Sequence, residues 1–177
     1  MREFFTAYDE LGQVYFFVAK GIKISPHQHA TSTDFEAVKM FYGNVYEQFT
    51  SLVDILAMLN NMLAGRKYDT FQTLTLRKYR ELDRPARFGP FKDNETFMAI
   101  CEEADNQIRN ASHHGSFVFE QGPQIIRYHS GKGGTGPEQI ISYVDYLARC
   151  VRIFLQTMTL LRIELILSNQ LRVRPAI

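Results

Sequence analysis

The chain has 177 residues, a length typical of one domain with a single hydrophobic core. Hydrophobic residues make up 45% of it and charged residues 22%, the composition of an ordinary soluble globular protein. The formal net charge of +1 excludes an overall basic field of the kind that attracts nucleic acids. Any contact with RNA would therefore depend on a local cluster of Lys and Arg.

The sequence carries no signal for export or for membrane insertion. Asp9 and Glu10 interrupt the apolar N-terminal residues before the core of a signal peptide develops. The most apolar segment, 151–167, contains charged and polar side chains, which predicts a core helix with one solvent-facing side. Cys101 and Cys150 are expected to be reduced, buried thiols, with a disulfide left open. We expect a cytoplasmic protein.

The first 31 residues are expected to form an N-terminal extension of the domain. Phe4, Tyr8, Leu11, Tyr15 and Val18 follow one another at steps of three and four, which predicts a helix over the first twenty residues. The run at 14–18 is rich in β-forming residues, so a strand is the alternative. Residues 25–33 contain a proline and are predicted to form a loop.

A long amphipathic helix is predicted next. Ser32, Thr33 and Asp34 are candidate N-caps, and Glu36 stands three residues after Thr33, as in a capping box. Apolar residues then recur every three to four positions up to Gly65, which predicts one helix facing the core. A second helix is predicted over 70–82, with a linker at 84–90.

The second half of the chain is predicted to hold two more helices around a β-hairpin. Asp93 and Asn94 open a helix that ends at Gly115, with residues 97, 100, 104, 108 and 111 as its buried stripe. Residues 116–129 alternate around a turn at 121–123, as in a hairpin, and 130–137 form a Gly-rich loop. The last long helix is predicted to start at Pro137.

These elements predict an all-α fold, a bundle of four to five helices with a β-hairpin inserted before the last long helix. We expect a single domain over residues 1–177, with the helical core at 32–170.

The motif that carries chemistry is Arg-Asn-Ala-Ser-His-His-Gly at 109–115. Arg109 can hold a phosphate through several fixed donors, and His114 can move a proton near neutral pH. Five helical residues turn the chain by about 500°, so the two side chains share a face only if the helix ends at His114. The structural alternative is that Arg109 pairs with Asp105 and that His114 merely caps the helix.

This motif resembles the Arg-Asn-x-x-x-His motif of the HEPN superfamily of all-helical domains. In many of these proteins the motif is the active site of a metal-independent endoribonuclease, composed of two copies that face each other across a homodimer. The resemblance implies that Arg109 and His114 are the catalytic pair, that Asn110 orients them, and that His113 is an accessory or a bystander. The implied reaction is transesterification by the ribose 2′-OH, which restricts cleavage to RNA and needs no metal or other cofactor.

The resemblance also implies a biological setting, a toxin–antitoxin or phage-defence system with an antitoxin or regulatory protein as a further partner. Some HEPN domains have no nuclease activity. The alternatives are therefore a non-catalytic module for dimerisation or for binding a nucleotide or a partner protein, and a C-terminal part of a larger effector.

Three other features compete for function. The loop at 131–136 resembles a phosphate-binding loop, but Pro137 and Glu138 stand where such loops have Lys and Ser or Thr, which favours a mobile connector. The histidine groups 27 and 29, or 113, 114 and 129, lack nearby Cys or carboxylate ligands at metal-binding spacing, so no metal is expected. A basic run indicates either a solvated face or a guide for RNA; its members are Arg77, Lys78, Arg80, Arg84 and Arg87.

Overall fold

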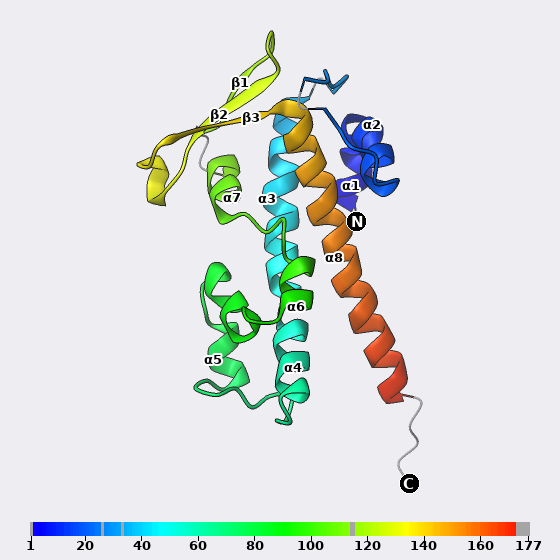
Figure 1. Cartoon of the computed structure of the whole chain (residues 1–177), viewed down its shortest axis with the longest axis vertical. Coiled ribbons are helices and arrows are strands. Elements are labelled where there is room, and N and C mark those ends of the chain that lie inside the picture. The colour runs from blue at the N-terminus through cyan, green and yellow to red at the C-terminus, as the bar shows by residue number, and fades with distance from the viewer. Residues whose placement is uncertain (1, 26, 33, 114–115, 173–177) are drawn as a thin grey trace. The chain divides into compact units, whose positions relative to one another are not determined.

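The computed structural model describes residues 2–25, 27–32, 34–113 and 116–172. The chain is mostly helical, at 62%, and the described residues form eight α-helices and one three-stranded antiparallel sheet (Figure 1). The prediction of a helical fold is confirmed, and the strands lie before the last long helix as expected. None of the helices in the described ranges is long and apolar enough to cross a membrane.

The chain divides into two compact units. The first contains the residues up to Tyr46 together with Asp105–Phe154, and the second contains Glu47–Ala104 together with the residues from Leu155 onward. The prediction of one domain over the whole chain stays a prediction, and each unit is described by itself.

The N-terminal residues form two helices of the first unit, α1 (Arg2–Thr6) and α2 (Tyr8–Ala19), so the alternative of a strand at 14–18 is wrong. Leu11 and Val14 are buried on one side of α2, and Phe4 stacks on Phe154 with ring centroids 4.0 Å apart. Burial of these apolar side chains stabilises the helices against the extended alternative. The segment predicted as an extension therefore contributes to the core of the first unit.

The predicted long helix is two helices, α3 (Phe35–Leu52) and α4 (Asp54–Leu63), separated at Val53. Asp34 acts as the N-cap of α3, since its Oδ1 accepts a hydrogen bond of 2.9 Å from the backbone N–H of Ala37. Thr33, one of the predicted caps, lies outside the described residues. Val53 is fully buried and β-branched, and the backbone N–H of Leu56 bonds to its carbonyl, which tightens the chain there.

Helix α4 ends at the predicted glycine. Gly65 has a φ of +72°, and the backbone N–H groups of Gly65 and Arg66 donate to the carbonyls of Met62 and Asn61. This is a Schellman motif, which requires a left-handed residue at that position.

The helix predicted over 70–82 is wrong for most of its length. Only α5 (Leu76–Arg80) is helical, and Thr75 caps it by accepting a hydrogen bond from the N–H of Lys78. The preceding residues form a loop closed by a bridge between Thr70 and Thr75. Phe71 in this loop stacks on Tyr79, with centroids 4.9 Å apart, so tertiary packing overrides the weak helical pattern.

The segment predicted as a linker forms a 3-10 helix, η1 (Arg84–Phe91). The helix predicted over 93–115 is also divided, into α6 (Glu95–Ile100) and α7 (Asn106–His113). Asn94 and Asp105 each start one of these helices by accepting hydrogen bonds from the N–H groups of the first turn. Two caps eleven positions apart in a helical pattern favour two short helices over one long one.

The predicted hairpin is confirmed as β1 (Val118–Glu120) and β2 (Ile125–His129), and the sheet order is β1-β2-β3. The third strand, β3 (Glu138–Ser142), follows a 3-10 turn, η2 (Lys132–Gly134), and pairs Ile140 with Arg127. The last helix therefore starts at Tyr143, as α8 (Tyr143–Arg172), and not at Pro137. The consecutive β-branched residues Ile140 and Ile141 favour the strand.

The core of the first unit is unusually rich in tyrosine. Tyr42, Tyr46, Tyr143 and Tyr146 are each fully buried, and Phe117 packs edge-on against Tyr146 with centroids 5.3 Å apart. Cys150 in this core and Cys101 in the second unit are both buried and form no disulfide, as predicted for reduced thiols. Burial raises the pKa of Tyr146 well above its ordinary value, so this core keeps the hydroxyl in its neutral form.

Candidate functional site

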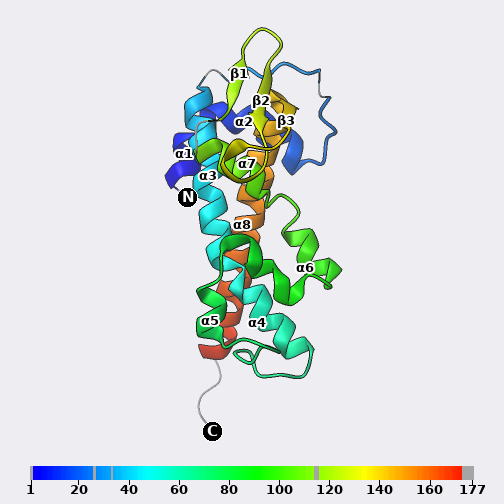
Figure 2. The ribbon, with the colours of Figure 1, turned by 90° about the vertical axis from the view of Figure 1, so that its left-hand side faces the viewer.

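The motif helix α7 is attached at its first turn to α3, and the two run side by side within the first unit (Figures 1 and 2). The Asp105 carboxylate accepts hydrogen bonds from the N–H groups of Gln107, at 2.8 Å, and Ile108, at 3.3 Å. Two buried tyrosines of α3 reach the same turn. The Tyr42 hydroxyl accepts from the N–H of Asp105 at 3.2 Å, and that of Tyr46 donates to Asn106 Oδ1 at 3.4 Å.

Helix α7 has one buried face and one more exposed face. Ile108, Ala111 and Ser112 are buried, which fixes the rotation of the helix. Arg109 and His113 are four residues apart and so lie on one side of it. The described part of α7 runs to His113, and the predicted helix end at His114 and Gly115 lies outside the described residues.

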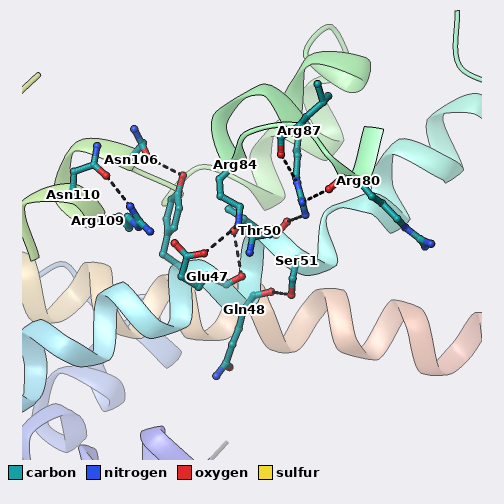
Figure 3. A network of polar contacts seen from close by, with 12 residues as sticks. Glu47, Gln48, Thr50, Ser51, Arg80, Arg84, Arg87, Asn106, Arg109 and Asn110 are labelled. Carbon is teal, nitrogen blue, oxygen red and sulfur yellow. Dashed lines mark hydrogen bonds and ion pairs between the residues drawn. The ribbon is translucent and has the colours of Figure 1, made fainter. Parts of the chain in front are cut away.

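The guanidinium of Arg109 is held beside the next side chain of the motif. Its Nη1 donates a hydrogen bond of 3.0 Å to Asn110 Oδ1, as Figure 3 shows, and the Arg109 side chain is partly buried. The backbone carbonyl of Arg109 accepts a hydrogen bond of 2.8 Å from the buried Ser112 hydroxyl. A guanidinium is a planar, permanently charged group of the kind that binds an anion such as a phosphodiester.

Of the two motif histidines, the structure describes one. His114, predicted as the catalytic partner of Arg109, lies outside the described residues, as does Gly115. His113 is exposed, and the edge of its ring lies against the backbone of Gly43 in α3. The described part of the site is therefore Arg109, Asn110 and His113.

Asp105, the alternative partner of Arg109, has other contacts. Besides capping α7, its Oδ2 lies 3.7 Å from Nη1 of Arg149 on α8. Burial, with a smaller contribution from the Asp105 charge, raises the pKa of the nearby Tyr128 hydroxyl. Asp105 thus connects α7 to α8 at the base of the motif helix.

The Gly-rich loop is fastened to the motif helix. Gln107 Oε1 accepts a hydrogen bond of 2.6 Å from the N–H of Gly131, and Gly136 N–H donates to the Ser130 carbonyl at 2.7 Å. The loop leads into β3 instead of the helix that follows the glycines of a phosphate-binding loop. These contacts describe a connector between two strands that touches α7.

The basic run belongs to the second unit, where most of its members make contacts within the protein. Arg80 pairs with Asp54 at 2.9 Å. Arg84 pairs with Glu47 at 3.1 Å, as Figure 3 shows. Arg87 donates to three backbone carbonyls, those of Thr50, Arg80 and Leu82. Arg77 pairs with Glu81, and Lys78 is exposed. These arginines stabilise η1 and α5, and a guiding role for RNA stays a prediction.

A cavity of about 820 Å³ also lies in the second unit, lined by residues between Asn60 and Thr96. Its amide side chains bond to the protein itself: Asn60 Nδ2 to the Pro90 carbonyl at 2.9 Å, Asn94 Nδ2 to Asn60 Oδ1 at 3.3 Å, and Asn61 Nδ2 to the Tyr68 carbonyl at 3.0 Å. The first of these bonds holds η1 against α4, and the other two fasten Asn94, beyond η1, and the loop after α4, so the amides have a structural role in this unit.

No cluster of three or more His, Cys, Asp or Glu residues suited to a metal ion occurs among the described residues. Of the histidines considered as ligands, His129 has its Nδ1 3.1 Å from the carbonyl of Gly136, and His27 and His29 are exposed in the loop before α3.

Three residues that contact the motif helix were not predicted from the sequence to belong to the site. Tyr42 and Tyr46 matched only the apolar pattern of a core helix, and their hydroxyl contacts depend on the packing of α7. Gly43 did give a signal, because a glycine inside a helix is destabilising by about 1 kcal/mol relative to alanine. The glycine at this position allows the close approach of the His113 ring to α3.

Comparison of the chain with protein-family models, with curated proteins and with solved structures finds no match.

Proposed function

We propose that this protein is a metal-independent endoribonuclease with Arg109, Asn110 and His114 as its catalytic motif. The observation that supports it best is the Arg109 guanidinium, held by Asn110 on the partly exposed side of a short helix. The motif itself resembles that of HEPN ribonucleases.

In the proposed reaction the 2′-oxygen of a ribose attacks the adjacent phosphorus, and the bond from phosphorus to the 5′-oxygen breaks. One proton leaves the 2′-hydroxyl and one reaches the departing 5′-oxygen. The products are a 2′,3′-cyclic phosphate and a 5′-hydroxyl. Arg109 stabilises the charge on the non-bridging oxygens, and His114 transfers protons.

The proposed active form is a homodimer in which two copies of the motif face one RNA strand. A two-fold contact duplicates Arg109 and His114 without additional sequence. The HEPN resemblance suggests a toxin–antitoxin or phage-defence setting, with an antitoxin or regulatory protein as the further partner. The alternative is a non-catalytic module for dimerisation or for binding a nucleotide or a partner protein, as part of a larger effector or alone.

The deciding experiment is incubation of the purified protein with a mixed RNA pool in excess EDTA. We expect cleavage, with 2′,3′-cyclic or 3′-phosphate ends seen by mass spectrometry. Arg109→Lys serves as the matched control for contaminating nucleases, since it keeps the charge and removes the planar fork. If the folded parent protein leaves RNA intact, or if Arg109→Lys cleaves equally well, the enzyme proposal is wrong and the binding module is favoured.

A further inference from the structure

The ring of His113 lies unusually close to helix α3. A Cβ atom added to Gly43 would lie 2.7 Å from Cδ2 and 3.1 Å from Cε1 of His113, with Nε2 closer still. Real Cβ atoms do not lie at such distances, so a side chain at position 43 would displace the ring from this place. Gly43 is buried in the middle of α3, where alanine would favour the helix by about 1 kcal/mol.

Packing, and not hydrogen bonding, holds this imidazole. The three ring atoms nearest to Gly43 are Nε2, Cδ2 and Cε1, so Nδ1 lies at the opposite side of the ring. Among the described residues no hydrogen-bond partner of the His113 ring is found, and the residue is exposed. The ring is thus held in place with Nδ1 directed away from Gly43. Such an imidazole is suited to contact an anion or to transfer a proton.

His113 also lies on the same side of α7 as Arg109, one turn further along the helix. A phosphodiester bound by the Arg109 guanidinium would therefore lie toward this imidazole. Transesterification needs two proton transfers, one from the 2′-hydroxyl and one to the 5′-oxygen, and an imidazole beside the bound phosphodiester is placed to make one of them.

We propose that His113 is a second catalytic histidine, which contacts the scissile phosphodiester beside Arg109, and that Gly43 is the residue that positions it. This inference rests on the proposed ribonuclease function. It assigns one of the two proton transfers of the proposed reaction to His113. No co-reactant is required, because the proton taken from the 2′-hydroxyl is balanced by the one given to the 5′-oxygen.

The test compares two glycine-to-alanine variants. Gly43→Ala displaces the His113 ring but keeps the imidazole, whereas Gly12→Ala adds a methyl group in α2 that meets the Tyr8 ring at an ordinary 3.8 Å. Alanine favours helix at both positions, and the activities are compared after circular dichroism has shown that both variants are folded. We expect Gly43→Ala to cleave RNA at least tenfold more slowly than Gly12→Ala, and His113→Ala to lose roughly 10²-fold or more.

A second measurement does not depend on cleavage. Inorganic phosphate has the same charged oxygens as the backbone of RNA and serves as the probe. We expect it to shift the NMR signals of the His113 ring in the parent protein and in Gly12→Ala. The shift should be absent in Gly43→Ala. If Gly43→Ala does not fold, the double variant Gly43→Ala/His113→Ala removes the clash, and His113→Ala alone then decides the catalytic role.

The outcomes separate the two proposals. If the parent protein does not cleave RNA but phosphate shifts the His113 signals, the ribonuclease proposal fails and the anion contact of His113 stands. If RNA is cleaved and His113→Ala acts within a few-fold of the parent, the catalytic role of His113 is overturned whatever the titration shows. Unmoved His113 signals overturn the anion contact.

Discussion

Nη1 of Arg109 donates a hydrogen bond to Oδ1 of Asn110, the neighbouring residue of the same helix, at 3.0 Å. Adjacent residues of a helix point in different directions, so the contact forms only because both side chains bend toward each other. Asn110 thereby fixes Nη1 of the guanidinium. The loss of conformational entropy on ordering the long Arg109 side chain thus occurs during folding and not on ligand binding. This relationship gives the dipeptide at 109–110 a physical role.

The first prediction concerns this dipeptide. Arg109→Lys should abolish measurable cleavage, because an ammonium group cannot make the two-pronged contact with a phosphate. Asn110→Ala should reduce the rate by about tenfold, since one hydrogen bond contributes about 1 to 1.5 kcal/mol. Initial rates on a labelled RNA measure both effects, with circular dichroism as the control for folding. An Asn110→Ala variant that is less active than Arg109→Lys would contradict the assigned order of roles.

A second prediction is the oligomeric state of the active protein. A composite site requires two copies, so light scattering should give about twice the mass of one chain at concentrations where RNA is cleaved. Activity should also fall faster than linearly on dilution below the dissociation constant of the dimer. An active monomer would show that one copy of the motif is sufficient.

The sequence predicted helices well where the apolar pattern was long and marked by a cap or a glycine. The ends of α3 at Asp34 and of α4 at Gly65, and the hairpin of β1 and β2, were all read from local signals. The failures are places where long-range packing decides. Phe71 folds back onto Tyr79 and keeps its loop from becoming helix, and β3 forms because Ile140 and Ile141 pair with β2.

The candidate site shows the same division. The residues Arg109, Asn110 and His113 stand out in the sequence because of their chemistry. The residues that hold them do not, since Tyr42 and Tyr46 matched only a core pattern and Gly43 a helix defect. Their roles depend on which face of α3 meets α7, and this is a property of the folded unit.

A third prediction tests the attachment of α7. Asp105→Ala removes the acceptor for two N–H groups of the first turn and should reduce the free energy of unfolding by about 1 kcal/mol. Asp105→Asn keeps a capping oxygen and should cost less, although it removes the charge facing Arg149. Urea denaturation at neutral pH measures both. Equal losses in the two variants would assign the effect to the ion pair instead of the cap.

A fourth prediction follows from two buried acids. Burial raises the pKa of the Cys101 thiol from 9.0 to about 12 and that of the Tyr143 hydroxyl from 10.0 to about 12. The folded state thus keeps its protons where the unfolded chain has lost them. The stability from these groups is complete below pH 9 and declines as the pH rises toward 12.

Urea denaturation at pH 8 and at successively higher pH should therefore show that the free energy of unfolding falls as the pH rises. In Tyr143→Phe this decline should be shallower, because one of the two groups no longer titrates. A stability that is constant from pH 9 to 11 in the parent would contradict the burial of both groups.

The last prediction concerns how RNA is cleaved and the proton transfer assigned to His114. Because the attacking group is the 2′-hydroxyl, an RNA with a single 2′-deoxyribose at the scissile position should be inert there, while cleavage elsewhere continues. Removal of proton transfer in His114→Ala should lower the rate by roughly 10²- to 10⁴-fold in the presence of EDTA. The measurement is the rate of product formation on matched ribose and deoxyribose substrates, after circular dichroism has shown that the variant is folded. Cleavage of the deoxyribose substrate at that position would exclude attack by the 2′-oxygen. Full activity of a folded His114→Ala would remove this histidine from the site and leave His113 as the motif's proton-transferring group.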